Sequence, residues 1–498
     1  MRLMMTARAV AMALLSLAAA GSTPALAPAQ APTTAGRMLT LEEARELARR
    51  NNPVYLQSVR NVDPASARVR SAYGAFIPNI SSSLSTDFRE GRPQFFGGQA
   101  FGATSDVVSS GYQFDARMSI NSATLLGPRQ ARAQLAAAEA DVTSARQTLA
   151  QQVTLQYIAA VEQQAQAQLQ DTLVASAAAQ LALAEARSAA GAATLLDVQR
   201  AQVQLGQQEV QRLRARNGVE IEKLRLFQQL AVDQPADVQL VTEFPVFEPQ
   251  FQLDELLAMA RGDNPELIAR RSRDRAAQAG LVQSRGQYAP SLNLYAGVGG
   301  FTQTYTDDGF LLDRAVGGRR ENCLFTQQVR DIVGQPSDPT TCSSIVLSPT
   351  EEQQIIQGNQ QFPFGFNRNP YVLSASLSLP IFNGFTRELQ VQQASAERDN
   401  ARYAVRAYEL QLLADVTGTY RTLQTDFQAI TIQRQAAETA RQALELAQER
   451  YRVGATNFVE LAQAQADFAT VQTEYIRAIY AFHRSFANLE TAVGRSLR

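Results

Sequence analysis

Two carboxylic acids occupy matching places in the 498-residue sequence. Asp197 follows Gly191 by six residues, and Glu460 follows Gly454 by six residues. A carboxylate just after a helix break can be stabilised by the positive end of the dipole of the next helix. A carboxylate beside a narrow passage would instead attract cations and repel large anions. The sequence leaves both roles open, and one side chain can serve both.

Side chains that could perform catalysis are not grouped in the sequence. The only histidine, His483, lies beside a heptad-spaced apolar seam, so we expect a packed or surface side chain rather than a base. The sequence has no phosphate-binding glycine loop and no cluster of metal ligands, which predicts a non-enzymatic protein without cofactor or metal. With 46 basic and 47 acidic side chains, the net charge of −1 gives no electrostatic case for binding nucleic acid.

The N-terminus is typical of a secretory signal peptide. Arg2 and Arg8 supply the positive end, Ala9 to Ala20 forms a short apolar run, and cleavage after Ala29 would follow a small-x-small pattern. Residues 1–29 are therefore predicted to be removed on export, and residues 30–38 to form a linker. The apolar run is too short to cross a membrane as a helix. Because no cysteine lies near the cleavage region, we expect no lipid anchor.

The two cysteines of the chain are Cys323 and Cys342, which lie 19 residues apart in a stretch rich in Gly, Pro and Ser. Neither their number nor their spacing fits a metal site. Export to an oxidising compartment makes a disulfide between them plausible.

The sequence contains the same unit twice. Three pairs of positions share an offset of 212 residues: Leu41 and Leu253, Pro53 and Pro265, Pro78 and Pro290. Four further pairs share an offset of 263 residues: Val153 and Val416, Tyr157 and Tyr420, Arg187 and Arg450, Gly191 and Gly454. The change of offset indicates a large insertion in the second copy. The duplication predicts two like modules, residues 39–240 and 253–494, joined by a linker at 241–252.

Long helices dominate both copies. The run from about 129 to 190 contains no Pro and no Gly and is rich in Ala, Gln, Leu and Glu, so it predicts a rod of roughly 90 Å. Further long helices are predicted over about 195–230, 386–453 and 457–493. Shorter helices are predicted over Leu41–Asn51, Val54–Phe76, Leu253–Asp263 and Glu266–Gln287, with Asn-Pro pairs between them.

The last two long helices show the spacing of coiled-coil pairing. Apolar side chains step by three and four residues along each helix, which predicts thin seams between antiparallel rods rather than one thick core. The two seams are Val405, Tyr408, Leu412, Val416, Tyr420, Leu423, Phe427 and Ile430, and Tyr475, Ile479, Phe482, Phe486, Leu489 and Val493.

Between the short and long helices lie segments in which apolar and polar residues alternate, the pattern of strands with one apolar face. They predict two β-hairpins, at about 79–121 and about 291–381, the second with a long extracellular loop at about 307–369. The ten residues from Tyr112 to Asn121 are enough for a tilted strand to cross a bilayer. Four strands cannot close a barrel, and an open edge in lipid is not tolerated, so the strands predict an oligomer that shares an 8- or 12-stranded barrel.

The order of short helices, strands, long helix, Gly break and long helix, repeated twice, resembles the TolC-type outer-membrane factor family. The resemblance covers about 39–493. Its specific marks are the Asn-Pro pairs, the breaks Arg187-Ser-Ala-Ala-Gly191 and Arg450-Tyr-Arg-Val-Gly454, the segments Asp197-Val-Gln-Arg-Ala-Gln202 and Glu460-Leu-Ala-Gln-Ala-Gln465, and Leu379-Pro-Ile-Phe-Asn-Gly384.

The resemblance implies a mainly α fold with membrane β: a homotrimer with a 12-stranded barrel in the outer-membrane lipid and an α-helical tunnel across the periplasm. Such proteins are passive exit ducts. They dock a periplasmic adaptor (membrane fusion) protein and, through it, an inner-membrane pump of the RND or ABC type, in tripartite efflux or type I secretion. The resemblance thus implies the bacterial outer membrane, with a periplasmic extension, as the location.

The resemblance also implies a role for the two Gly breaks. Relatives close the periplasmic tip of the tunnel with polar contacts, using a Tyr three residues before the second Gly, an Arg two after it, and acids six after each Gly. Here these positions are Tyr451, Thr456, Asp197 and Glu460, so one ionic contact is expected to be lost at Thr456. Three copies of Glu460 around the axis would then favour cations.

Two other classes of protein are weighed against an exit duct. A periplasmic coiled-coil adaptor or structural stalk would share the long helices, although adaptors carry a single hairpin and are not duplicated in this way. An exported enzyme is disfavoured by the lack of an acid–base pair. Within the class of ducts, the sequence does not separate drug or metal efflux from protein secretion.

Overall fold

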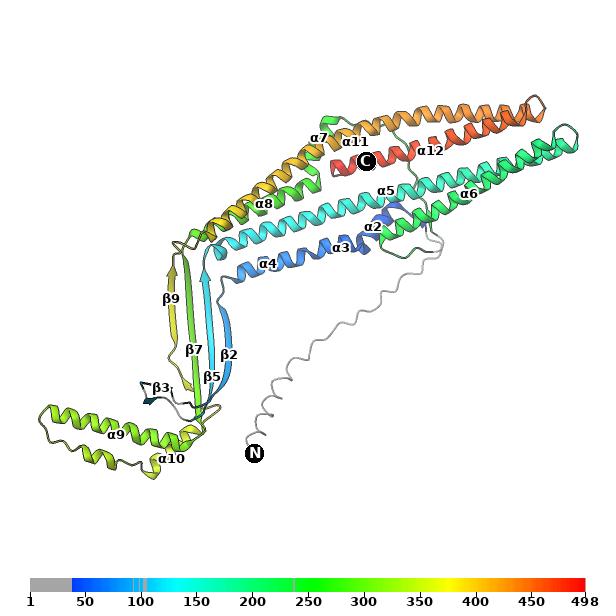
Figure 1. Cartoon of the computed structure of the whole chain (residues 1–498). Coiled ribbons are helices and arrows are strands. Elements are labelled where there is room, and N and C mark those ends of the chain that lie inside the picture. Colours follow the sequence, from blue (N-terminus) through cyan, green and yellow to red (C-terminus); the bar gives the residue numbers. More distant parts are fainter. Residues whose placement is uncertain (1–37, 93, 98, 102–104, 236–237, 498) are drawn as a thin grey trace.

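Four long helices dominate the shape of the molecule (Figure 1). The computed structural model describes residues 38–92, 94–97, 99–101, 105–235 and 238–497; the predicted signal peptide and nearly all of the linker after it lie outside these residues. The long helices are α5 (Ser122–Ala189), α6 (Leu195–Leu230), α11 (Thr386–Arg452) and α12 (Phe458–Val493). They form two antiparallel hairpins, α5–α6 and α11–α12, that run alongside each other. None of the helices within the described residues is both long and apolar enough to span a membrane.

Helix α5 begins seven residues before the predicted start near 129. Asn121 caps it, because its side-chain oxygen accepts a hydrogen bond from the amide of Thr124, and the Thr124 hydroxyl donates to the Ser119 carbonyl at 2.7 Å. Pro128 therefore lies inside the helix, where it lacks the amide that would bond the Thr124 carbonyl. The helix of 68 residues thus starts at the cap and continues through Pro128.

Short helices precede the strands in both copies: α2 (Leu41–Asn51), α3 (Pro53–Arg60) and α4 (Val62–Gly74) in the first, α7 (Leu253–Asp263) and α8 (Pro265–Arg285) in the second. The expectation of one helix over Val54–Phe76 is wrong, because the chain breaks at Asn61. Pro64 has no amide to bond the Arg60 carbonyl, which removes a helical hydrogen bond at this point. The helix predicted to reach Gln287 ends at Arg285 and continues as a 3-10 turn, Gly286–Tyr288.

Hydrogen bonds at equivalent positions support the duplication. Asn52 donates through Nδ2 to the carbonyl of Gln229 at 3.0 Å, and Asn264 donates to the carbonyl of Ala492 at 3.0 Å. Each asparagine also caps the helix that its following proline begins. The Asn-Pro pairs thus join the start of a short helix to the end of α6 or α12.

Two tyrosines repeat a second contact. Tyr157 donates from its hydroxyl to the carbonyl of Leu39 at 2.7 Å, and Tyr420 donates to the carbonyl of Phe251 at 3.0 Å. The partners, like the tyrosines, stand at equivalent places in the two copies.

Both predicted seams are confirmed. Every one of their side chains belongs to a single apolar cluster between α11, α12 and α7, in which Leu423, Phe482, Leu489 and Val493 are fully buried. His483 is buried beside this seam, with its ring centroid 5.2 Å from those of Phe244 and Phe482. The packing of His483 is thus structural, as its position predicted.

The longer strands form one antiparallel sheet that continues from the helices (Figure 1). Its main strands are β2 (Asn79–Arg89), β5 (Val107–Ile120), β7 (Ser291–Tyr305) and β9 (Val372–Ser378), in the order β2-β5-β7-β9; β8 (Asn367–Arg368) also pairs with β7. Two small pairs complete the strands, β1 (Met38–Leu39) with β6 (Gln239–Leu240) and β3 (Gln94–Phe96) with β4 (Gln99–Phe101).

The register of the sheet places apolar residues opposite apolar residues. Met118 pairs with Leu294, which pairs in turn with Ala375, while on the other face Arg117 pairs with Tyr295, opposite Ser374. Because side chains alternate between faces, one face of the sheet is apolar and the other is polar. This is the alternation expected of strands with lipid on one side.

The expectation of a long loop at 307–369 is wrong. These residues form an arm of two helices, α9 (Asp308–Ile332) and α10 (Pro349–Asn359), with a 3-10 turn at Pro339–Ser344 (Figure 1). Ser348 begins α10 through a capping box, in which the Glu351 side chain bonds the Ser348 amide at 2.8 Å and the Ser348 hydroxyl accepts from the Glu351 amide. Local capping thus builds helix where composition alone indicated loop.

Candidate functional site at the helical tip

The two Gly breaks close the ends of the two long hairpins with the same backbone geometry. Gly191 and Gly454 have φ angles of +72° and +79°, in the left-handed region that glycine adopts without steric cost. Ala192 donates its amide to the carbonyl of Arg187 at 2.7 Å, and Ala455 donates to the carbonyl of Arg450 at 2.8 Å. These are the six-to-one bonds of Schellman caps, so each glycine ends one rod and turns the chain into the next.

Asp197 is held in the first turn of α6. Its carboxylate accepts hydrogen bonds from the amide and the hydroxyl of Thr194, at 3.0 and 2.8 Å, and its own amide bonds the Thr194 hydroxyl at 3.2 Å. The hydrogen bonds from Thr194 lower the pKa of Asp197. Of the two roles that the sequence left open, Asp197 therefore has the first: its carboxylate stabilises the start of a helix.

Because its pKa is lowered on folding, Asp197 contributes stability that is present above its ordinary pKa and is lost as the pH falls through the folded value. We expect Asp197→Asn to loosen the start of α6 at neutral pH, by about 0.3–1 kcal/mol, because a neutral amide replaces the negative charge at the helix N-terminus while the Thr194 cap remains. Amide hydrogen exchange over 195–200 measures this loosening. The difference from the parent should shrink as the buffer is acidified, and an undiminished difference in acid would contradict the assignment.

Glu460 lies in a different setting. Asn457 caps α12, and its side chain accepts the amide of Glu460 at 3.0 Å, so the Glu460 carboxylate is not needed for the cap. One carboxylate oxygen lies 3.4 Å from Nη1 of Arg450, and the other accepts the hydroxyl of Thr456. The side chain is about half exposed. Within one chain, Arg450 thus provides an ion pair to the acid, although Thr456 stands where the family resemblance implies an arginine.

Tyr451 and Arg187 join the two hairpins. Tyr451 is buried, with its ring centroid 6.1 Å from that of Phe458, and burial raises its pKa. The guanidinium of Arg187, from the other hairpin, lies 4.7 Å from the centre of the Tyr451 ring and donates to the Tyr451 carbonyl. Arg187 also donates to the carbonyl of Ala192 at 3.1 Å. One cation therefore ties both turns together.

Small side chains let the helices approach behind this contact. The tip cluster contains the buried residues Ala184, Ala201, Leu444, Ala447, Tyr451, Phe458 and Leu461, from all four long helices. The structure thus brings Asp197, Arg187 and Tyr451 into one electrostatic neighbourhood, and Asp197 and Arg187 act in opposite directions on the pKa of Tyr451. Glu460 pairs separately, within its own hairpin.

Arg187 was not among the predicted site residues. The available signal is that Arg187 and Arg450 stand at equivalent positions, four residues before each Gly. The sequence does not show that one would cross to the neighbouring hairpin while the other pairs locally. Within the described residues, no group of three or more His, Cys, Asp or Glu side chains is placed to hold a metal ion.

Comparison with known proteins agrees with this geometry. The sequence model of the family named outer membrane efflux protein matches residues 44–232 and 350–495, which is more than half of the chain. A membrane protein of Pseudomonas aeruginosa superposes with a TM-score of 0.68 at 19% identity, over 92% of this chain and 90% of its own. The CmeC outer membrane channel of Campylobacter jejuni superposes with a TM-score of 0.69 at 14% identity, over 91% of this chain and 85% of its own.

Among curated proteins, nodulation protein T of Rhizobium leguminosarum bv. trifolii is 23% identical over 136 residues. That match spans 27% of this chain and 29% of the relative.

The repeated hairpins, the sheet with one apolar face and the helical tip define an α-helical tunnel joined to a β-barrel unit. The chain belongs to the outer membrane efflux protein family. The family consists of channels in the bacterial outer membrane with a periplasmic extension, and the structural likenesses independently support the fold. This assignment favours an efflux channel over the adaptor or stalk that the long helices also allowed.

Proposed function

We propose that three copies of the chain close into an exit duct that carries substrates from an inner-membrane pump and a periplasmic adaptor to the outside of the cell. The observation that carries this proposal is the pair of open sheet edges. Within the described residues, β2 pairs only with β5 and β9 pairs only with β7, so the outer edges of β2 and β9 are unpaired. In lipid such edges must be closed, and pairing β9 of one copy with β2 of the next gives 12 strands.

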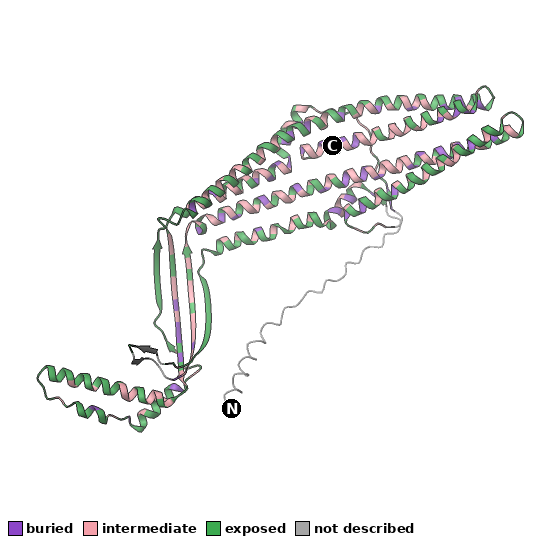
Figure 2. Cartoon of the chain, in the orientation of Figure 1, coloured by how far each residue is buried: buried purple, intermediate pink, exposed green. Residues whose placement is uncertain are grey.

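Exposed apolar side chains on the outermost long helices support the same arrangement. Much of α6 and α11 is exposed in the single chain (Figure 2). Leu213 and Leu224 of α6 are 64% and 58% exposed, and Tyr403 and Ile432 of α11 are each 68% exposed. In a ring of protomers, α6 of one copy would pack against α11 of the next and cover these side chains. Burying them at about 25 cal/mol per Å² of apolar surface would favour assembly.

The polar face of the sheet would line the exit. Tyr295 donates to the carboxylate of Asp115 at 2.6 Å, and Gln113 donates to it at 3.1 Å. Arg117 lies 3.5 Å from the other carboxylate oxygen. In this network the negative and positive side chains are paired with each other. The polar face can therefore line a water-filled passage without an unpaired charge.

In this arrangement the duct is passive, and energy comes from the partner pump. The Gly191 and Gly454 turns at the periplasmic tip offer the docking surface for an adaptor, and the pump behind it would be of the RND or ABC type. Tripartite efflux and type I secretion both use these parts.

Accumulation of a fluorescent efflux dye in cells with and without the gene tests the proposal, together with a census of proteins in the culture medium. We expect the deletion strain either to retain more dye or to release fewer proteins, and the intact gene to restore the missing activity. A deletion strain that differs in neither readout from its parent would contradict an exit duct.

Glu460 is the proposed charge at the narrow end of the duct. We expect Glu460→Ala to reduce the preference for cations, because three carboxylates near one axis attract cations and repel anions. The reversal potential of single channels in a potassium chloride gradient measures this preference. Asp171→Asn is the matched control, since it also removes one carboxylate per copy but lies 20 residues before Gly191, where it pairs with Arg216. Unchanged selectivity in Glu460→Ala would remove this acid from the constriction.

A further inference from the structure

The helical arm of α9 and α10 has a fixed root at the extracellular end of the sheet. Asn359, the last residue of α10, is buried and bonds the segments that meet at this root. Its side-chain oxygen accepts the amide of Tyr305 at 2.7 Å, and Nδ2 donates to the carbonyl of Tyr305 and to Asp308, each at 2.8 Å. These three bonds connect the end of β7, the start of α9 and the end of α10. The direction of the arm is therefore set by the fold.

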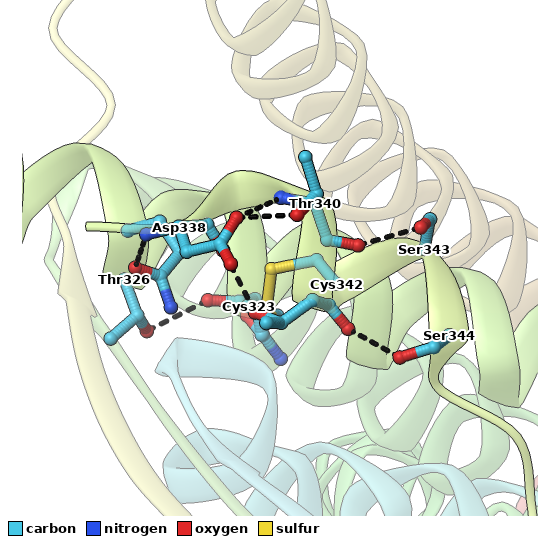
Figure 3. The surroundings of a disulfide bond; sticks show 10 residues. Cys323, Thr326, Asp338, Thr340, Cys342, Ser343 and Ser344 are labelled. Atoms are coloured by element: carbon cyan, nitrogen blue, oxygen red, sulfur yellow. Dashed lines mark hydrogen bonds between the residues drawn. A yellow bond between two sulfur atoms is a disulfide. The ribbon is translucent and has the colours of Figure 1, made fainter.

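One side of α9 is occupied by the returning chain of the arm. Cys323 and Cys342, whose pairing the sequence made plausible, form a disulfide with a Cα–Cα distance of 5.6 Å (Figure 3). Arg319 pairs with Glu351 of α10 at 2.8 Å, and this hydrogen bond, together with those from Ser348, lowers the pKa of Glu351 to about 2. The arm is thus a stiff unit with its inner side already packed.

The opposite side of α9 presents an apolar stripe with no partner inside the described part of the chain. This outer stripe consists of Gly318, Phe325, Val329 and Ile332, spaced by seven, four and three residues, so its members share one helix face. Phe325 is 65% exposed and Ile332 is 82% exposed. A Cβ added at Gly318 would meet nothing within 4 Å. A glycine inside a helix costs about 1 kcal/mol relative to alanine, and no contact in the chain itself explains it.

The position of the arm indicates what covers the stripe. In Figure 1 the arm extends past β9, on the side of the sheet away from β2. That is the side on which the open edge of β9 would meet β2 of a neighbouring copy. The 25 residues of α9 span about 38 Å, whereas four tilted strands occupy about 25 Å of the barrel wall. The arm is therefore long enough to extend across the four strands that one neighbouring copy contributes to the barrel.

We propose that the arm is a strap between subunits: the outer stripe of each arm packs on the extracellular end of the adjacent copy of this chain. The inference rests on the proposed trimer. The strap would hold neighbouring copies together at the end where the β9–β2 pairing closes the barrel.

The residues beside the stripe favour a protein surface over a lipid surface. Glu321 and Gln328 flank it on one side, and Asn322 and Thr326 flank it on the other. Helices that lie on membranes carry Lys and Arg along the polar face, where they attract anionic headgroups. On α9 the chain itself engages three of the four arginines: Arg314 donates to the Tyr305 hydroxyl at 3.2 Å, Arg319 pairs with Glu351, and Arg320 donates to the carbonyl of Ile345 at 3.3 Å.

Photo-crosslinking in outer membranes tests the strap. Phe325→p-benzoylphenylalanine places the reactive group on the outer stripe, and Arg330→p-benzoylphenylalanine, about 140° around the same helix, is the matched control. The expected result is a covalent adduct between two copies from position 325 and none from position 330. The mass of the unirradiated complex, measured in parallel, shows whether the protein is a trimer.

A trimer that gives no chain-to-chain adduct from position 325, an adduct with lipid or another protein only, or equal adducts from both positions would overturn the strap and leave the proposed duct standing. A protein that is not a trimer would overturn both. A second comparison uses Phe325→Asp with Ile332→Asp against Arg330→Asp. The paired stripe variant should lower the temperature at which trimers dissociate, and a temperature unchanged from the control would contradict the strap.

Discussion

Arg187→Ala is expected to open the periplasmic tip and to raise the conductance of single channels. The side chain donates to the Tyr451 carbonyl, and its guanidinium lies over the Tyr451 ring, so it links the α5–α6 turn to the α11–α12 hairpin. A hydrogen bond from a charged donor contributes about 1.5–3 kcal/mol, and a partly buried cation–π contact about 1–2 kcal/mol. Loss of both contacts from each copy would allow the two hairpins to separate.

Arg450→Ala is the matched control for this experiment. Arg450 stands at the equivalent position of the second copy but pairs with Glu460 in its own hairpin. Its loss removes no contact between the two hairpins, so the conductance should stay well below that of Arg187→Ala, while the freed Glu460 carboxylate should strengthen the preference for cations. Arg187→Lys should fall between the parent and Arg187→Ala, because lysine keeps the charge but cannot donate to both turns with a planar fork. Equal conductance in Arg187→Ala and the parent would show that this contact does not hold the tip closed.

Leu373→Arg is expected to remove most of the assembled protein from the outer membrane. Leu373 lies on the apolar face of β9, opposite Ala296 of β7, and is 72% exposed in the single chain. An arginine facing lipid near the middle of the bilayer costs about 2–4 kcal/mol, and three copies would each bear this cost. Folding titrations in lipid vesicles and the yield of heat-resistant oligomer measure the loss.

Ser376→Arg provides the comparison on the same strand. Ser376 lies on the polar face, opposite Asn293, where an added charge would meet water in the passage. This variant should assemble in nearly normal amounts. If the two variants lost stability equally, the assignment of the apolar face to lipid would be wrong.

The long helices and their seams could be predicted because their signals are local and periodic. The apolar steps from Val405 to Ile430 and from Tyr475 to Val493 determine which side of each rod is buried, whatever the neighbouring copy does. The sequence alone also shows that the Asn-Pro pairs mark boundaries between helices. The structure is needed to show that each asparagine also bonds the end of a long helix far away in the sequence.

The arm and the centre of the tip could not be predicted in the same way. Residues 307–369 contain glycines and prolines that indicate loop, although Ser348-Pro-Thr-Glu351 is a capping-box signature that marks the start of α10. Arg187 and Arg450 look alike in sequence, and only the packing of the two hairpins gives one of them a partner 264 residues away. Contacts between residues this far apart in the sequence produce no periodic pattern in it.

The mass of the detergent-solubilised complex tests the central claim of a shared barrel most directly. The two open edges of the sheet, at β2 and β9, predict a closed ring of three identical chains. A mass equal to three processed chains is the expected result. A stable complex of one chain, or of any number other than three, would contradict the 12-stranded barrel and the exit duct built on it.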